Sequence, residues 1–225
     1  MKTVTYYSDT SSLRDQSAYS RYYNGLPDFR KQKADRFVFE KDRLLSVGVW
    51  LLLRRGLEDL GEDIDSLEFD KTENGKPYIR NSDIRFNLSH SHDRVMCVIS
   101  DHDVGCDVEM ISPIDMNVAR RFFYGSEYDM ILAETDPNRR HELLYRFWTL
   151  KESFMKATGL GFRLPLDSFR IDLGDAVTVE QHVDGSEYRF AEYDVNDGCR
   201  YAVCCRNGDI DGSMVHVDLD TTNVD

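Results

Sequence analysis

The chain lacks the features that mark membrane, disulfide-bonded and nucleic-acid-binding proteins. Its longest apolar run, LLSVGVWLLL, spans ten residues, whereas a helix that crosses a bilayer needs about 20. Its five cysteines are an odd number with no Cys-x-x-Cys pair, so we expect buried thiols in a reducing cytoplasm. Its 28 basic residues are outnumbered by 41 acidic ones, and a general nucleic-acid-binding surface needs a positive excess. We therefore expect a cytoplasmic protein that binds neither membrane nor nucleic acid.

Familiar motifs of nucleotide binding and hydrolysis are also missing. The chain has no Walker loop, no Gly-x-Gly-x-x-Gly motif after a strand, and no Gly-x-Ser-x-Gly turn for a nucleophilic serine. The glycines of GLGF, at residues 159–162, follow a helical pattern and are typical of a helix C-terminus. A phosphate site in this chain would have to be built from dispersed side chains.

The apolar content is sufficient for one large domain or two small ones, since 41% of the 225 residues are hydrophobic. Helix-type and strand-type patterns alternate along the chain, with two helices over residues 27–60 that are interrupted around Phe39, a helix over residues 138–158, and strands over residues 84–111 and 168–206. This order predicts an α+β fold of two lobes, residues 1–112 and 113–225, each with an antiparallel sheet packed on a long helix. Residues 98–111 predict a β-hairpin.

Two carboxylates stand close together in the strand-type segment Gly105–Met110. The two-residue period of a strand places Asp107 and Glu109 on one face and turns Cys106 toward the core. The two acidic residues would lie about 7 Å apart, close enough to converge on one hard cation. A solvent-facing strand edge is the plainer explanation, but acidic residues are depleted in strands.

The segment RFWTLKESFMKATGLG, residues 146–161, contains the end of the second long helix and carries a second set of polar residues. Its apolar residues recur at spacings of three and four and predict the buried face, while Trp148, Glu152 and Lys156 follow one another at intervals of four on another face. An ordinary Glu–Lys pair worth ~0.3–0.5 kcal/mol would explain this spacing. The functional alternative makes Glu152 a third metal ligand and Lys156 a phosphate clamp.

Further candidate donors lie in FNLSHSHD and NGKPY. Strand alternation places His90 and His92 on one face and Ser89 and Ser91 on the other, and Lys76 follows a turn. A zinc site at the His-x-His pair is not expected, because no second pair of soft ligands has the required spacing. Three carboxylates for a hard divalent ion, together with Lys, Ser and His donors, are the chemistry that a pyrophosphate group needs.

The ordered set NGKPY, FNLSHS, GCDVE, RRFFYGSEY, FWTLKESFMKATGLGF and LPLDSF resembles the 4′-phosphopantetheinyl transferases, specifically the surfactin-synthetase-activating type with two fused lobes. The likeness extends from about residue 28 to residue 206. The combination of Gly-x-Asp-x-Glu with Trp-x-x-Lys-Glu-x-x-x-Lys some forty residues later is far more specific than either motif alone.

The resemblance implies transfer of the phosphopantetheine arm of coenzyme A to a serine of an apo acyl or peptidyl carrier protein, with release of adenosine 3′,5′-bisphosphate. It implies a monomer of two lobes related by a pseudo-twofold axis, with coenzyme A between them. By motif position, Mg²⁺ would be held by Asp107, Glu109 and Glu152. Coenzyme A would be bound by Lys76, Ser89, His90 and Lys156, and its 3′-phosphate by a basic cluster of Arg30, Lys31 and Lys33.

That cluster lies in the one positive stretch of the chain, residues 21–55, which has nine basic and four acidic residues. The general base that would accept the serine proton is not settled by the sequence. Glu152, Lys151, Glu127 and a metal-bound water are all candidates.

Two other functions use the same residues. A metal-dependent nucleotide phosphodiesterase would activate water and need no protein partner. A catalytically silent module that binds coenzyme A or a carrier protein would keep the fold without the chemistry.

Overall fold

The computed structural model describes residues 2–220. The strands are β1 (Thr3–Asp9), β2 (Phe69–Lys71), β3 (Pro77–Ile79), β4 (Arg85–Ser91), β5 (Arg94–Ser100), β6 (Val104–Met110), β7 (Arg170–Leu173), β8 (Val177–Glu180), β9 (Tyr188–Tyr193), β10 (Cys199–Arg206) and β11 (Ile210–His216). The α-helices are α1 (Gln16–Asn24), α2 (Asp28–Asp35), α3 (Glu40–Asp59), α4 (Met116–Ala119), α5 (Gly125–Ala133) and α6 (Pro137–Thr158). None of the helices in this part of the chain is both long and apolar enough to span a membrane.

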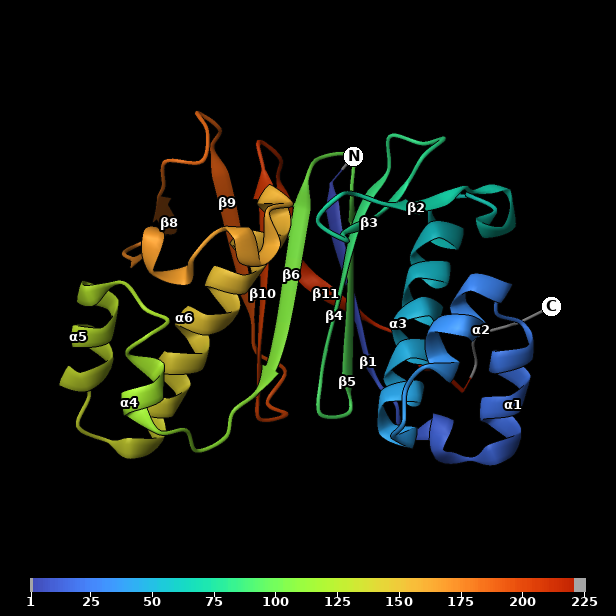
Figure 1. The fold of residues 1–225 in the computed structure, drawn as a ribbon, viewed down its shortest axis with the longest axis horizontal. Helices are drawn as coiled ribbons and strands as arrows, with labels where there is room; N and C mark the ends of the chain where they lie inside the picture. Colours follow the sequence, from blue (N-terminus) through green and yellow to red (C-terminus); the bar gives the residue numbers. More distant parts are fainter. Residues whose placement is uncertain (1, 221–225) are drawn as a thin grey trace.

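The strands form the middle of the molecule, and the two long helices α3 and α6 flank them on opposite sides (Figure 1). Helix α3 packs on the sheet ordered β11-β1-β5-β4, and α6 packs on the sheet ordered β6-β10-β9. Two small sheets, β2-β3 and β7-β8, lie beside them. The predicted α+β class, with a long helix on each main sheet, is confirmed.

Helix α6 begins and ends at residues that suit a helix terminus. The side chain of Asp136 accepts hydrogen bonds from the free backbone N–H groups of Asn138 and Arg139 at 2.8 and 3.1 Å, with proline in the first turn. Helix α6 ends at Gly159, whose φ of 72° lies in the left-handed region that favours glycine. The Gly-Leu-Gly segment is therefore a helix C-terminus, as predicted.

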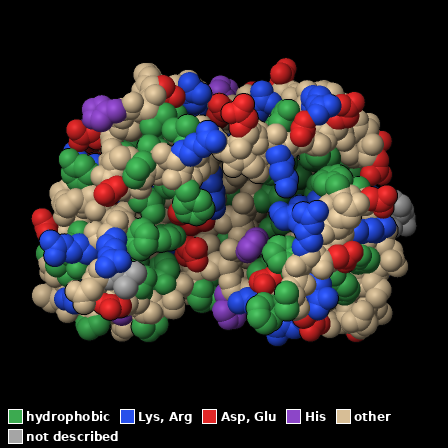
Figure 2. Space-filling model, viewed as in Figure 1, with side chains coloured by type: hydrophobic (Ala, Val, Ile, Leu, Met, Phe, Trp, Pro, Cys, Tyr) green, Lys and Arg blue, Asp and Glu red, His purple; other side chains and the backbone are tan. Residues whose placement is uncertain are grey.

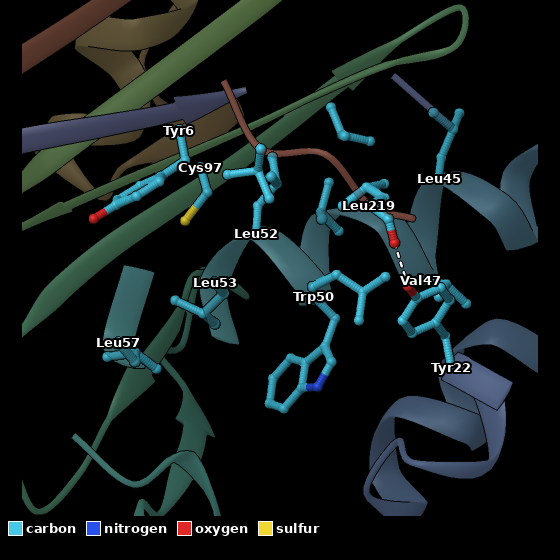
Figure 3. Packing of buried hydrophobic residues seen from close by; sticks show 14 of the residues in the cluster. Tyr6, Tyr22, Leu45, Val47, Trp50, Leu52, Leu53, Leu57, Cys97 and Leu219 are labelled. Atoms are coloured by element: carbon cyan, nitrogen blue, oxygen red, sulfur yellow. Dashed lines mark hydrogen bonds between the residues drawn. The ribbon is translucent and has the colours of Figure 1, made fainter. Parts of the chain in front are cut away.

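The first half has a continuous apolar core between α3 and its sheet. Figure 3 shows Leu52 of α3 beside Tyr6 of β1 and Cys97 of β5 and, farther along the helix, Val47 beside Tyr22 of α1. The Tyr22 hydroxyl donates to the carbonyl oxygen of Leu219, which also packs in this core. The end of the described chain is thus part of the first half.

The strand connections differ from the sequence prediction at one important point. Strands β5 and β6 follow one another through a short turn, but β6 pairs with β10, whereas β5 pairs with β1 and β4. The predicted hairpin over residues 98–111 is therefore wrong. The turn residues were recognised correctly, but the pairing partner is 89 or more residues away in the chain and leaves no local signal.

Backbone pairing also crosses the predicted boundary between residues 112 and 113. Strand β6 precedes this boundary and pairs with β10, and β11 returns to pair in parallel with β1. The division into lobes 1–112 and 113–225 stays a prediction, and each half supplies a strand to the sheet of the other.

A close approach between β6 and α6 depends on Gly105. A Cβ atom at this position would lie 2.1 Å from the carbonyl oxygen of Ser153 and 2.4 Å from the backbone nitrogen of Ala157. Both neighbours are backbone atoms of α6, so they cannot give way by rotating a side chain. The glycine therefore allows the helix to lie directly against the strand.

We expect Gly105→Ala to force α6 away from β6 and to lower the free energy of unfolding by about 1–3 kcal/mol, the usual cost of overpacking. Urea denaturation followed by circular dichroism measures the change. Gly212→Ala is the matched control, because a Cβ there meets nothing within 4 Å. Equal stability of the two variants would contradict the close-approach argument.

Candidate active site

A cavity of about 580 Å³ opens between the two halves, and we call it the central cleft. Its walls come from β4, β6, α6 and the segment after α6. Figure 2 shows the molecule hollowed in the middle, with hydrophobic side chains gathered on the left of the hollow and Lys and Arg side chains on the right. The cleft brings together six of the predicted site residues: Ser89, His90, Asp107, Glu109, Glu152 and Lys156.

The side chain of Asp107 is the most buried of the cleft carboxylates, with 3% of the residue exposed. Its Oδ1 atom accepts hydrogen bonds from Lys156 Nζ at 2.6 Å and from Ser89 Oγ at 2.9 Å. Its Oδ2 atom is buried and has no hydrogen-bond partner among the described residues. Oδ1 thus accepts two hydrogen bonds, whereas Oδ2 accepts none from the described residues. Buried polar atoms without a hydrogen bond are rare in folded proteins, so Oδ2 needs an explanation.

Glu109 and Glu152 complete the acidic side of the cleft. Glu109 Oε2 accepts a hydrogen bond of 2.7 Å from Ser91 Oγ. Burial and the charge of Asp107 raise the pKa of Glu109, and burial and the same charge raise the pKa of Glu152 against the opposing effect of Lys156. The three carboxylates therefore lie near enough to repel one another.

These residues suit a hard divalent cation in their chemistry. All three side chains supply carboxylate oxygens, and Asp107 Oδ2 is unpartnered. As the side chains stand in residues 2–220, however, no group of three or more His, Cys, Asp or Glu side chains is close enough to hold a metal ion. Glu152 is partly exposed, so its side chain has room to turn toward Asp107 and Glu109.

Lys156 supplies the positive charge that the acidic side of the cleft needs. Its Nζ atom donates to Asp107 Oδ1, to the carbonyl oxygen of Cys106 at 3.0 Å and to Ser89 Oγ at 3.2 Å. Burial by itself would lower the pKa of Lys156, but the charge and hydrogen bond of Asp107, together with Cys106 and Glu152, outweigh burial and raise the pKa. The Lys156 side chain is 26% exposed and lines the cleft.

The positive side of the cleft includes His90 at the end of β4. Burial of its ring and the charges of Lys156 and Lys33 lower the pKa of His90. Lys33 itself has its pKa lowered to about 8 by burial and by the charges of Arg30 and Lys71. This mutual influence places the basic cluster of α2 on the side of His90, although its members do not line the central cleft.

Two predicted coenzyme A ligands are engaged elsewhere. Arg30 is 6% exposed, donates to the carbonyl oxygen of Ser46 at 2.5 Å, and lies over the ring of Trp50. Lys76 donates to the carbonyl oxygens of Val104 and Lys156 at 2.9 and 2.6 Å and so ties the β2-β3 turn to the end of α6. Lys31 is half-buried on α2, beside the same cluster. A role for these residues in binding coenzyme A stays a prediction.

Two of the candidate general bases lie outside the cleft. Lys151 Nζ donates to Glu127 Oε1 at 2.7 Å and to the carbonyl oxygen of Phe169 at 2.8 Å, and neither charged side chain is exposed. Glu127 also accepts from the backbone N–H groups of Tyr124 and Ile171 at 2.9 and 2.6 Å. The pair joins α5, α6 and β7 inside the second half, and of the three side-chain candidates only Glu152 lines the cleft.

The apolar wall of the central cleft was not predicted from the sequence to be part of the site. The wall consists of Met155 of α6 and, after the helix, of Phe162, Leu164, Pro165 and Leu166. The Phe162 residue is 92% exposed. The motifs GLGF and LPLDSF were noted, but their spacing alone gave no reason to place them beside β6. Ser91 was noted as sharing a face with Ser89, and its bond to Glu109 became visible only in the structure.

Family models and known proteins match most of the chain. Residues 14–102 match the model described as 4′-phosphopantetheinyl transferase, N-terminal, and residues 103–205 match the 4′-phosphopantetheinyl transferase superfamily. The 4′-phosphopantetheinyl transferase Sfp of Bacillus subtilis (strain 168) is 31% identical over 213 residues, 93% of this chain and 94% of that protein. The transferase gsp of Aneurinibacillus migulanus is 36% identical over 166 residues, 73% of this chain and 69% of that protein.

Among solved structures, Thermotoga maritima holo-[acyl-carrier-protein] synthase aligns with 47% of this chain and 63% of its own, at 21% identity and a TM-score of 0.40. The sequence matches, on a fold whose cleft gathers carboxylates and a lysine, make the protein a transferase. The chain belongs to the 4′-phosphopantetheinyl transferase family.

We expect Glu127→Gln or Lys151→Met to lower the free energy of unfolding by about 3–5 kcal/mol, because each leaves an uncompensated buried charge. The double variant Glu127→Gln/Lys151→Met should recover part of this loss. Urea denaturation of the three proteins measures it, with Glu152→Gln as the control from the same helix. Two single variants as stable as the original chain would show that this pair does not stabilise the second half.

Proposed function

We propose that this protein transfers the 4′-phosphopantetheine arm of coenzyme A to a serine of an apo acyl or peptidyl carrier protein, in an Mg²⁺-dependent reaction that releases adenosine 3′,5′-bisphosphate. The observation that carries the proposal is the arrangement at Asp107. One of its oxygens is held by Lys156 and Ser89, and the other is buried without a hydrogen-bond partner in residues 2–220. Glu109 and Glu152 lie beside it in the central cleft.

Asp107, Glu109 and Glu152 would hold the metal ion. When bound there, Mg²⁺ supplies positive charge to the diphosphate bridge of coenzyme A as the bond to the leaving group breaks. Lys156 already places an ammonium group between Asp107 and the cleft, with all three of its donors engaged by protein oxygens. It can bind a phosphate oxygen by exchanging its contact with Ser89, which at 3.2 Å is its longest.

Glu152 is the candidate base that the cleft geometry favours, because Glu127 and Lys151 are sealed in the second half. Burial raises the pKa of Glu152, which strengthens it as an acceptor of the serine proton. The proton reaches Glu152 directly or through a water that it orients. The nucleophile is on the carrier protein, so the chain itself needs no activated serine or cysteine.

The positive charges near His90 and α2 suit the phosphates of coenzyme A. Burial, together with the charges of Arg30 and Lys71, lowers the pKa of Lys33 to about 8, and an arriving phosphate would relieve the repulsion among these cations. A single chain supplies both sides of the cleft, with Ser89 from the first half and Glu152 and Lys156 from the second. We therefore propose that the enzyme acts as a monomer, and we place it in the cytoplasm, where its five buried thiols stay reduced.

Carrier proteins that are acidic would be repelled by a chain of net charge −13. We therefore propose that docking relies on the apolar wall of the cleft and a few local cations. Arg121 lies at the cleft beside Phe122 and is exposed, and it is the local cation that this surface offers.

Intact-mass spectrometry of an apo carrier protein incubated with this chain, coenzyme A and Mg²⁺ tests the reaction. We expect a gain of one phosphopantetheine, and no gain with Asp107→Ala or Glu152→Ala. Asp172→Asn, at an exposed carboxylate away from the cleft, is the control and should transfer normally. Hydrolysis of coenzyme A without modification of the carrier would favour a phosphodiesterase instead, and normal transfer by Glu152→Ala would contradict the site assignment.

Lys156→Met should raise the Michaelis constant for coenzyme A, because the ammonium group that would bind phosphate is lost while the stem remains. Steady-state kinetics with varied coenzyme A and saturating carrier protein measure the change. Lys41→Met, at an exposed lysine on α3 outside the central cleft, serves as the control. An unchanged Michaelis constant in Lys156→Met would exclude the proposed clamp.

A further inference from the structure

Strands β4 and β6 lie side by side in the described structure without pairing through backbone hydrogen bonds. Side chains of β4 accept hydrogen bonds from the backbone N–H groups of β6 instead. The backbone N–H of Cys106 donates to Asn87 Oδ1 at 2.9 Å, and that of Met110 donates to Ser91 Oγ at 3.2 Å. Between them, the N–H of Val108 approaches Ser89 Oγ at 3.4 Å. Each bond joins residues 19 positions apart, so the register is that of two parallel strands.

The donors on β6 face β4 because β6 pairs with β10 along its other edge. Without partners they would be buried unpaired N–H groups at the seam between the two main sheets. Three polar side chains at alternate positions of β4 satisfy them, and we call this set, Asn87, Ser89 and Ser91, the seam ladder.

The residue type at each position of the seam ladder differs according to whether that side chain also contacts a carboxylate of β6. An amide oxygen, as in Asn87, can only accept, and its rung faces Cys106, which is not acidic. A hydroxyl can accept from a backbone N–H and donate its own proton at the same time. Ser91 does both, accepting from Met110 and donating to Glu109 Oε2 at 2.7 Å, and Ser89 does the same for Val108 and Asp107.

We propose that Ser91 is a positioning residue for Glu109, fixing its carboxylate toward the metal site while it closes the seam between the sheets. The inference rests on the proposed function, because it assigns a metal-directed role to a side chain that would not touch the metal. Hydrogen bonds to ligating carboxylates orient them, and loss of such a bond typically weakens metal binding by about 10- to 100-fold. Ser91 is suited to this role because it is partly exposed at the end of β4, where its loss leaves the core packing intact.

The test is isothermal titration calorimetry of the purified chain with MgCl₂ in the presence of saturating coenzyme A. We expect Ser91→Ala to weaken Mg²⁺ binding at least tenfold, and Ser91→Thr, which keeps the hydroxyl, to bind within about threefold of the original chain. In kinetics, Ser91→Ala should recover most of its kcat at high Mg²⁺. Metal affinity equal to that of the original chain in Ser91→Ala would overturn the proposal.

Asn87→Ser is the matched control, because it shortens a rung of the same ladder that contacts no carboxylate. It should lower the melting temperature and leave Mg²⁺ affinity unchanged. Equal losses of Mg²⁺ affinity in Asn87→Ser and Ser91→Ala would assign Ser91 a purely structural role and overturn the proposal. If Ser91→Ala does not fold, Ser91→Cys, with a weaker donor of similar size, should show an intermediate affinity, and full affinity would contradict the inference.

The same titration separates this inference from the proposed function. Absence of Mg²⁺ binding by the original chain with coenzyme A would refute the metal-dependent reaction itself. Mg²⁺ binding by the original chain that Ser91→Ala retains undiminished would refute only the role of Ser91.

Discussion

The contact between Lys156 and Asp107 is the interaction on which the organisation of the cleft depends. It joins a helix of the second half to a strand whose other edge faces β4, and it places one positive charge among three carboxylates. Burial raises the pKa of all three carboxyl groups, and the charge of Lys156 opposes this effect. The helix reaches the strand at the required distance because residue 105 has no side chain.

The same helix carries a second buried lysine with a different consequence. Lys151 and Glu127 form a fully buried pair that also satisfies backbone groups of α5 and β7. Lys156, five residues later, is 26% exposed and opens onto the cleft. Exposure separates the two pairs: a sealed ion pair can only stabilise or orient the fold, whereas a pair at a cleft can exchange a protein oxygen for a ligand oxygen.

Much of this organisation follows from local patterns. The period of two in Gly105–Met110 correctly separated the carboxylates from Cys106, which is fully buried, and the period of four correctly put Trp148, Glu152 and Lys156 on one face of a helix that lines the cleft. The two helices around residue 39 were also predicted. Strand β1 was not predicted, and its partners, β5 and β11, are distant in the chain.

The predictions that failed or stayed open concern partners rather than patterns. The hairpin over residues 98–111 has the expected turn, but β6 turns away to pair with β10. The sequence could not distinguish the candidate bases Glu127 and Lys151 from Glu152. Adjacent residues on a helix point in directions about 100° apart, but other elements of the fold decide which direction faces the cleft.

By itself, the sequence determined the α+β class, the helix ends, the charges available for a site and the family likeness, because these depend on residue type and on spacing within one segment. Only the tertiary structure decided which carboxylates share a cleft, which lysine is open to it, and how the serines of β4 meet the acidic residues of β6. Those relations join atoms from segments far apart in the chain, and burial and hydrogen bonding at such contacts are set by the packing of all the elements together.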